Sequence, residues 1–386
     1  MTATRRRLSP EERQACLPWL EARFPVVRPP QVGSALVDRV RGMLLGLAIG
    51  DALGHGSEGL NPEERRRRFG EIRDYVTGTV GLPTDDTQLA FWTVESLLRC
   101  GGVDPDDLAR SFAQDRIVGI GGTVRAFLRA HKDEGRPWWE AGRPSAGNGA
   151  LMRIAPVVLP WLWGVAPQPW EDTVVATVVT HRDEAAVAAS VGFVGLLCEV
   201  LAGGTGAVAE RTEAAARRAK VADRSAGAAD WWPKTFLHYA RAVETGAVYW
   251  PRSPHVSFEG TLCQFVERFV VPAVEERMDP VAASRSWYSG AYLLETVPMA
   301  LLILAEYWDD PEEAIVRAVN DTRDNDTVGA IVGAMVGAMH GAQALPERWQ
   351  VNLTGRTREG DDGHVQWLIE RAVARLGEGQ AIGKER

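Results

Sequence analysis

Two runs of regularly spaced glycines constrain the fold of this chain more than any other feature. Glycine recurs at every fourth position over residues 42–54 and again over 329–341. Each glycine inside a helix costs about 1 kcal/mol relative to alanine, so a helix that keeps four of them must gain from close approach of another backbone. The same spacing occurs in membrane helix dimers, but these segments are short and contain Asp51 and His340, which excludes that reading. We expect two helices, each with an unusually near neighbour. The glycines are Gly42, Gly46, Gly50 and Gly54, and Gly329, Gly333, Gly337 and Gly341.

Helical periodicity dominates the rest of the chain. Apolar residues recur at intervals of three and four, and clearly alternating strand patterns are scarce. Asp104-Pro105 and Asp310-Pro311 each place an acidic cap before a proline at the first helical position. The sequence therefore predicts an all-α fold. The periodic segments are residues 37–54, 87–100, 105–115, 184–204 and 311–321.

Composition and charge narrow the class of protein. Of the 386 residues, 45% are hydrophobic and 24% are charged, which is typical of a globular chain that can bury a core. The formal net charge of −8 argues against nucleic acid as a partner, because that affinity comes mainly from Lys and Arg on phosphates. The basic run at 65–68 is interpreted as a solvated helix face. The four cysteines have no metal-binding spacing and are expected to be reduced and mostly buried.

The chain is expected to form one main domain. We predict an N-terminal extension over residues 1–34, a single all-α domain over 35–376 with an insertion at 203–260, and a flexible tail over 377–386. The N-terminus lacks the apolar core of a signal peptide, and no apolar run is expected to approach the ~18 residues of a membrane span. We therefore expect a cytoplasmic protein without membrane contact, and the oligomeric state stays open.

Two clusters of carboxylates and hydroxyls stand where apolar helices should begin, at residues 84–87 (TDDT) and 324–327 (DNDT). One interpretation is ordinary capping, because short polar residues and acidic groups stabilise helix N-termini. The other is a cation, since hard ions such as Mg²⁺ prefer carboxylate and hydroxyl oxygens. If the two helix starts face one another, the oxygens are enough for two metal ions. Together, the two clusters favour the cation.

The chain resembles the ADP-ribosylglycohydrolases, which include the dinitrogenase reductase-activating glycohydrolases and the ADP-ribosyl-acceptor hydrolases. Seven stretches occur in the order typical of that family, and together they span roughly residues 38 to 345. Two departures are Thr322-Arg323 in place of a Gly-Gly pair, and Gly59 where an aromatic residue often follows Glu58. The stretches are GMLLGLAIGDALGHGSEG (42–59), PTDDTQLAFW (83–92), GIGGTVRAF (119–127), GNGALMRIAPV (147–157), VVTHRDEAA (178–186), ETVPMALLIL (295–304) and DNDTVGAIVGAMVGAMHG (324–341).

The resemblance implies a compact orthogonal helical bundle with a metal-lined central cleft, two divalent cations (Mg²⁺ or Mn²⁺), and removal of ADP-ribose from an acceptor. The implied metal ligands are Thr84, Asp85, Asp86, Asp324, Asp326 and Thr327. The implied substrate-binding residues are Gly121, Gly122, Asn148, Gly149, Met152 and Arg153, with His181 also placed at the site. Asp51, inside a glycine-rich helix, is expected either to be buried with a partner or to face the cleft, and an indirect role at the site is favoured.

Several alternatives stay open at this point. The catalytic base is Glu58, Asp85 or Asp86, since metal coordination lowers the basicity of a carboxylate. The substrate is an ADP-ribosylated protein or an ADP-ribosyl small molecule, with ADP-ribosyl-arginine as the first hypothesis and serine, a base or a metabolite as other acceptors. The rival hypotheses are a homologue that binds ADP-ribose without turnover and a two-metal hydrolase of another substrate.

Overall fold

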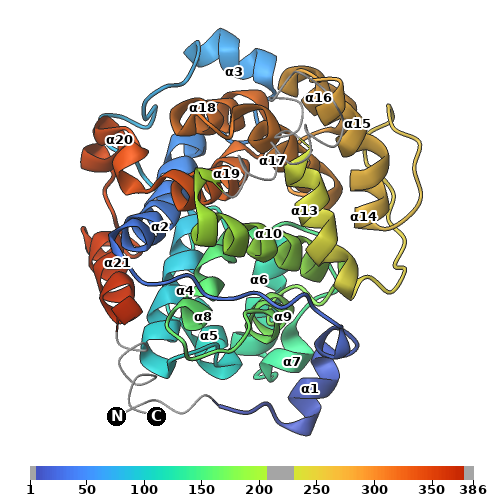
Figure 1. The fold of residues 1–386 in the computed structure, drawn as a ribbon, viewed down its shortest axis with the longest axis vertical. Helices are drawn as coiled ribbons and strands as arrows, with labels where there is room; N and C mark the ends of the chain where they lie inside the picture. The colour runs from blue at the N-terminus through green and yellow to red at the C-terminus, as the bar shows by residue number, and fades with distance from the viewer. Residues whose placement is uncertain (1–5, 207–229, 378–386) are drawn as a thin grey trace.

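A computed structural model of the protein describes residues 6–206 and 230–377, and its helices are arranged as Figure 1 shows. Within these two ranges the backbone forms helices joined by loops, and the extended pairing is limited to four isolated bridges. The prediction of an all-α fold is confirmed. Residues 207–229 of the predicted insertion, and the predicted tail from residue 378 onward, lie outside the described residues, as do residues 1–5.

The helices fall along the chain as follows. The first half contains α1 (Pro10–Cys16), α2 (Ser34–His55), α3 (Pro62–Phe69), α4 (Asp85–Cys100), α5 (Pro105–Phe112), α6 (Gly122–Leu128), α7 (Trp138–Ala141), α8 (Leu159–Leu162), α9 (Trp170–Val178) and α10 (Glu184–Gly203). The second half contains α13 (Trp231–Ala240), α14 (Leu262–Phe265), α15 (Val271–Glu275), α16 (Pro280–Trp287), α17 (Leu293–Tyr307), α18 (Pro311–Asp321), α19 (Asn325–His340), α20 (Glu347–Asn352) and α21 (His364–Ala374). Short 3₁₀ turns lie at Trp19–Glu21, Leu151–Arg153, Ala155–Val158, Arg241–Val243, Ala342–Ala344 and Arg375–Gly377, and π turns at Arg129–Asp133 and Val266–Val270.

The acidic caps predicted from the sequence begin two of these helices. The Asp104 carboxylate accepts hydrogen bonds from the backbone N–H groups of Asp106 and Asp107 at the start of α5. Asp310 does the same for Glu313 in α18. In both helices the following proline occupies the first helical position, where no N–H is needed. The two predicted starts are confirmed.

The two glycine runs pack against each other, so that α2 and α19 lie antiparallel with their backbones in contact. A methyl group on Gly46 would lie 2.1 Å from the carbonyl oxygen of Gly333, and one on Gly50 would lie 2.0 Å from that of Gly329. Only glycine permits this approach of one backbone to another. The antiparallel pairing also brings the C-terminal end of α2 next to the N-terminal end of α19, where Gly54 faces the backbone of Asp326.

Helix α10 crosses the middle of the bundle and packs against α9, α13 and α19. By length and composition it is apolar enough to cross a membrane, with a mean hydropathy of 2.1 over its most apolar stretch. The expectation that no apolar segment reaches that length is therefore wrong for α10. However, 89% of that stretch is buried inside the protein, as in the core helix of a helical bundle.

The first described residues lie along the bundle rather than apart from it. Trp170 donates its indole N–H to the carbonyl of Pro25, and the Gln168 amide pairs with both backbone groups of Val27. Glu12 accepts a hydrogen bond from the Trp138 indole and forms an ion pair with Arg6. These contacts attach the predicted extension to α7 and α9.

The described part of the predicted insertion, residues 230–260, packs on α10. Gly192 and Gly195 of α10 allow the rings of Phe236 and Tyr239 in α13 to approach closely. At the start of α10, the buried Glu184 carboxylate accepts backbone hydrogen bonds from residues 246 and 247. These hydrogen bonds hold the segment after α13 against the start of α10.

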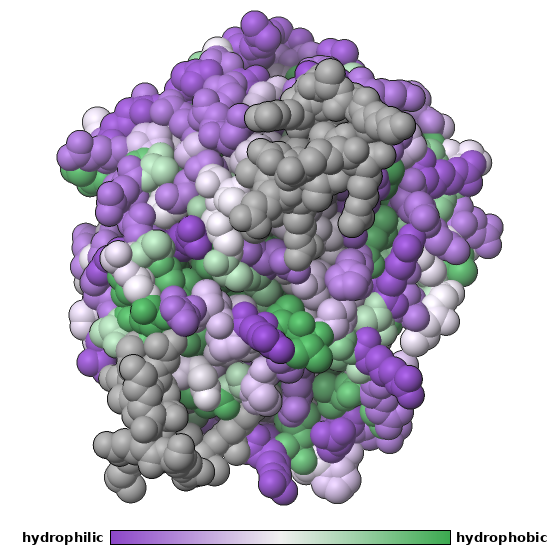
Figure 2. Space-filling view, in the orientation of Figure 1, coloured by the Kyte–Doolittle hydropathy of each residue, from purple (hydrophilic) through white to green (hydrophobic). Residues whose placement is uncertain are grey.

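The molecular surface is mainly hydrophilic over α3 and α18, at the top of Figure 2, with scattered apolar patches in the lower half of the view. Surface ion pairs cover this hydrophilic region, for example Arg73 with Glu313 and Arg348 with Glu312. The four cysteines are free, and three of them are buried, as predicted.

Candidate metal centre

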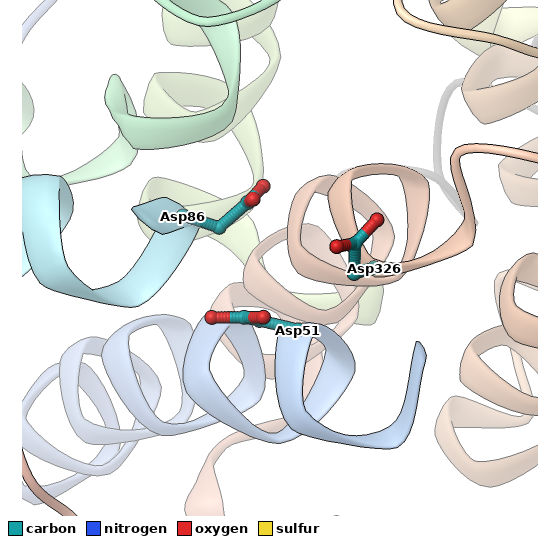
Figure 3. Close-up of side chains that lie close together, drawn as sticks. All are labelled: Asp51, Asp86 and Asp326. Carbon is teal, nitrogen blue, oxygen red and sulfur yellow. The ribbon is translucent and has the colours of Figure 1, made fainter. Parts of the chain in front are cut away.

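Three aspartates from three different helices converge at the centre of the bundle. Asp51 comes from α2, Asp86 from the first turn of α4, and Asp326 from the first turn of α19 (Figure 3). All three are buried, and each offers a carboxylate oxygen within 4.8 Å of the others. The glycine contacts between α2 and α19 cause this convergence, because they let two acidic helix ends meet at backbone distance.

A second triad lies beside the first and shares one member with it. Glu58, Asp324 and Asp326 also place one carboxylate oxygen each within 4.8 Å of one another. Glu58 is exposed and lies in the loop after α2, whereas Asp326 is buried. Two adjoining triads joined by Asp326 are the donor arrangement that a pair of neighbouring divalent ions requires.

The electrostatics of these groups call for a cation. Within the described ranges, no Lys or Arg forms an ion pair with a member of either triad, and one buried oxygen of Asp86, Oδ1, has no hydrogen-bond partner. Burial, followed by repulsion from neighbouring carboxylates, raises the pKa of Asp86 and of Asp326 well above the ordinary value. A buried anionic group that lacks a partner is costly unless it is protonated or coordinated to a metal. The residues therefore fit a divalent cation.

Helix capping does not account for the two acidic clusters. Thr84 and Asp324 occupy the cap positions of α4 and α19, but neither side chain accepts a capping hydrogen bond. The Thr84 hydroxyl instead donates to Asp51 Oδ1 at 2.7 Å and lies 3.4 Å from Asp86 Oδ2. The Asp51 carboxylate also accepts from the hydroxyl and N–H of Thr87. Thr84 and Thr87 thus fix Asp51 within the first triad.

The side-chain amide of Asn148 orients Asp324 in the second triad. Asn148 Nδ2 donates at 2.5 Å to Asp324 and at 3.0 Å to the hydroxyl of Thr296. The same amide group lies in the wall of the cleft above the metal centre. Asn148, predicted to bind substrate, therefore also orients a carboxylate.

The two triads open into a cleft of about 470 Å³, a size typical of small-molecule sites. Its wall includes the predicted site residues Glu58, Asp85, Asp86, Gly121, Gly122, Asn148, Gly149, Met152, His181, Asp324, Asp326 and Thr327. Two predicted residues do not line it. Thr84 lies beneath the floor against Asp51, and Arg153 is fully buried behind the wall.

Arg252 and Tyr292 are among the residues of the cleft wall that were not predicted from the sequence. The guanidinium of Arg252 donates to both carboxylate oxygens of the buried Glu295, at 2.7 and 2.6 Å, and lies over the Tyr292 ring. Arg252 is the one cationic side chain that the described part of the chain places in this wall. No local motif marks it, because only the tertiary fold brings residue 252 to the carboxylate of residue 295.

Arg65 supports the site from behind, contrary to the interpretation of residues 65–68 as a solvated face. Arg65 is fully buried, and its guanidinium donates to the carbonyls of Ser57 and Leu60 on one side and of Thr322 on the other. It thus ties the loop that carries Glu58 to the segment that leads into α19. An arginine can do this because its five donors are arranged as a rigid fork.

Metal affinity should depend on pH. Burial, then the charge of Asp51, raises the pKa of Asp85 to about 7, and burial raises that of Asp324 to about 6. Between pH values of about 4 and 7 these two carboxyl groups therefore hold more protons in the metal-free folded chain than in the unfolded chain, so their contribution to stability falls as the pH rises. A metal ion must displace these protons, so Mn²⁺ affinity is expected to increase by at least about tenfold from pH 5.5 to 7.5.

Calorimetric titration of Mn²⁺ at the two pH values measures this dependence. Proton release can be read in the same experiment from the heats in buffers of different ionisation enthalpy. An affinity that does not change with pH, without proton release, would contradict the assignment of these carboxylates as ligands.

Comparison with known proteins agrees with this geometry. A model of the family described as ADP-ribosylglycohydrolase matches residues 33–381. The chain is 34% identical over 191 residues to the ADP-ribosyl-[dinitrogen reductase] glycohydrolase of Rhodospirillum rubrum, an alignment that covers 47% of this chain and 64% of that protein. It is 31% identical over 183 residues to the ADP-ribosylarginine hydrolase Tri1 of Pseudomonas putida. This alignment covers 43% of this chain and 47% of that protein. The chain thus aligns with less than two thirds of the length of either relative.

Longer but weaker likenesses extend over most of the chain. An uncharacterized protein of Archaeoglobus fulgidus is 29% identical to this chain over 331 residues, which are 83% of this chain and 92% of that protein. A solved structure titled "ADP-ribosylglycohydrolase-related protein complex" covers 90% of this chain and 100% of its own, with a TM-score of 0.59 and 27% identity. The family match over residues 33–381 spans the residues of both triads.

Proposed function

The chain belongs to the ADP-ribosylglycohydrolase family, and from this premise we propose that it is a hydrolase that cleaves the glycosidic bond between ADP-ribose and an acceptor. The observation that carries the proposal is the pair of carboxylate triads that share Asp326 at the floor of the cleft. We propose ADP-ribosyl-arginine on protein as the first acceptor, because two relatives carry names that include ADP-ribosyl-dinitrogen reductase and ADP-ribosylarginine.

The proposed cofactor is a pair of divalent cations, Mg²⁺ or Mn²⁺. Asp51, Asp86 and Asp326 would hold one ion, and Asp324 and Asp326 would hold the other, with Glu58 beside it and free to take a proton. Bound there, the ions supply Lewis-acid chemistry, orienting ribose hydroxyls and increasing the acidity of water. The triads supply the hard oxygen ligands that these ions prefer.

Glu58 is the proposed catalytic base. It is the most accessible member of the triads and lines the cleft, and the partial loss of water around its carboxyl group inside the cleft raises its pKa. During hydrolysis, water forms the new bond to the anomeric carbon, and a carboxylate takes one of its protons. The bond from the anomeric carbon to the acceptor breaks, and the proton can pass from Glu58 to the departing nitrogen or oxygen. Asp86 is less suited, because it lies deeper within the first triad.

The charge of the cleft suits an anionic ligand once metal is present. Five carboxylates line its wall, namely Glu58, Asp85, Asp86, Asp324 and Asp326. Two divalent cations would offset four of these five charges, and Arg252, although paired with Glu295, would place a cationic group at the wall for the diphosphate of an ADP-ribosyl group. Arg252 is preorganised for this role, since Glu295 and Tyr292 hold its guanidinium at the wall.

A hydrolysis assay tests the proposal. An ADP-ribosyl-arginine peptide is incubated with the protein in Mg²⁺, in Mn²⁺ and in excess chelator, and free ADP-ribose is measured. We expect release only with metal, and serine-linked and base-linked substrates run in parallel rank the acceptors. Tight ADP-ribose binding without release from any substrate would support a non-catalytic homologue. Absence of both binding and release would support a two-metal hydrolase of another substrate.

A further inference from the structure

His181 presents one ring nitrogen to the cleft. The side chain is 1% exposed and lines the cleft wall just after α9. A methyl group built on Gly149 would lie 3.3 Å from His181 Nε2, and one on Gly147 would lie 3.7 Å from it. Two glycines therefore keep this nitrogen free of side-chain atoms on the side of the cleft.

The other ring nitrogen is engaged inside the protein. His181 Nδ1 lies 2.9 Å from the hydroxyl oxygen of Thr180, and the same oxygen lies 2.7 Å from Arg153 Nη2. A guanidinium can only donate, so Thr180 accepts from Arg153. Among the described residues the Thr180 hydroxyl has no acceptor other than Nδ1 within hydrogen-bond distance, so its single proton points to Nδ1. A neutral imidazole with an accepting Nδ1 carries its proton on Nε2.

Arg153 is buried at a cost that its own contacts do not offset. Its guanidinium is fully buried over the Phe112 ring, at 4.6 Å, and donates only to Thr180 and to the carbonyl of Ala176. Nε and Nη1 are buried and find no hydrogen-bond partner among the described residues. Burying unpaired polar groups is unfavourable by about 1–3 kcal/mol each. The side-chain hydrogen-bond acceptor of the guanidinium is the Thr180 hydroxyl, so its contacts tie it to the group that faces His181.

We propose that Arg153 and Thr180 are positioning residues that hold His181 in the Nε2–H tautomer and so give the cleft a fixed, uncharged hydrogen-bond donor. The ligand atom it meets is an oxygen, and its assignment to a phosphate or hydroxyl oxygen of an ADP-ribosyl group rests on the proposed function. Burial and the charge of Arg153 also lower the pKa of His181 to about 3, so the ring stays neutral at physiological pH. His181 then binds and orients ligand and does not transfer protons.

Nitrogen NMR of the imidazole rings tests the tautomer directly in the full chain, without ligand. The chain has seven histidines, and a His181→Gln variant identifies the resonances of His181. We expect Nε2 to carry the proton and the ring to stay neutral from pH 5.5 to 8. A proton on Nδ1, or a titration within that range, would overturn the proposal.

Substitutions at Thr180 test whether its hydroxyl fixes the tautomer of His181. Thr180→Val keeps the shape and removes the hydroxyl, so the tautomer should become mixed and ADP-ribose affinity in Mg²⁺ should fall by about tenfold. Thr180→Ser should restore both. Thr173→Val is the matched control, because Thr173 is a buried threonine of α9, the helix that precedes Thr180, and its hydroxyl donates to the backbone carbonyl of Pro169.

The NMR measurement and the affinity measurement together separate this inference from the proposed function. If the His181 tautomer is unchanged in Thr180→Val, the proposed role of Thr180 is overturned, whatever the ADP-ribose affinity of that variant. Unchanged ADP-ribose affinity in Thr180→Val also overturns it. If the wild-type chain fails to bind ADP-ribose with metal, the proposed function fails, and the NMR result on the unliganded protein still decides the tautomer.

Discussion

Replacing Asp326 with asparagine is expected to abolish hydrolysis and to weaken binding of Mg²⁺ or Mn²⁺ by at least about 100-fold, since loss of groups that merely support metal ligands costs 10–100-fold. Asp326 is the carboxylate common to both triads, so one substitution disrupts both proposed ion sites. The metal-free variant should also unfold at the same temperature as the metal-free wild type or higher. It loses one buried carboxylate whose pKa is raised by burial and by neighbouring acids.

The matched control is Asp310→Asn. Asp310 also stands at the start of a helix, but its carboxylate caps α18 outside the cleft, and asparagine caps a helix equally well. This variant should keep wild-type metal affinity and turnover. Full activity in Asp326→Asn, with metal affinity unchanged, would remove the proposed centre.

Replacing Gly333 with alanine is expected to cost about 3 kcal/mol or more of the free energy of unfolding, at or beyond the upper end of typical overpacking effects. The added methyl group would lie 2.1 Å from the carbonyl oxygen of Gly46. That atom belongs to a helix backbone and cannot rotate away, so α2 and α19 would have to move apart. Because the same helices carry Asp51 and Asp326, metal affinity should fall together with stability. Thermal and denaturant unfolding measure the first effect, and calorimetry the second.

Gly33→Ala serves as the control for this second prediction. A methyl group at Gly33 meets no atom within 4 Å, so the variant should stay within about 1 kcal/mol of wild type. If Gly333→Ala were as stable as the wild type, the close approach of the two helices would not be needed for the fold.

The helices could be predicted from sequence because their signals are local. Apolar periodicity and acidic caps before proline act within a few residues, and α5 and α18 begin at the predicted positions. The acidic clusters at 84–87 and 324–327 were visible for the same reason. The glycine runs predicted close packing, but not that each run is the partner of the other, because pairing is a tertiary property.

The rest of the site depends on contacts between residues far apart in sequence. Asp51 was expected either to be buried with a partner or to face the cleft, and the structure shows it buried, with Thr84 and Thr87 as its partners. Its place in the first triad could not be predicted, because those partners come from the start of another helix. Arg65 stands in a basic run that resembles a solvated surface, and only the tertiary fold provides its buried carbonyl acceptors. Each of these roles requires knowing which helices meet.

The most direct test of the account is a calorimetric titration of ADP-ribose into chelator-stripped protein, repeated after Mg²⁺ or Mn²⁺ is restored. We expect ADP-ribose to bind only to the metal-loaded protein, because the carboxylate triads repel an anionic ligand until cations occupy them. Equal binding in both states would separate the ligand from the triads. No binding in either state would contradict the assignment of the cleft to an ADP-ribosyl group.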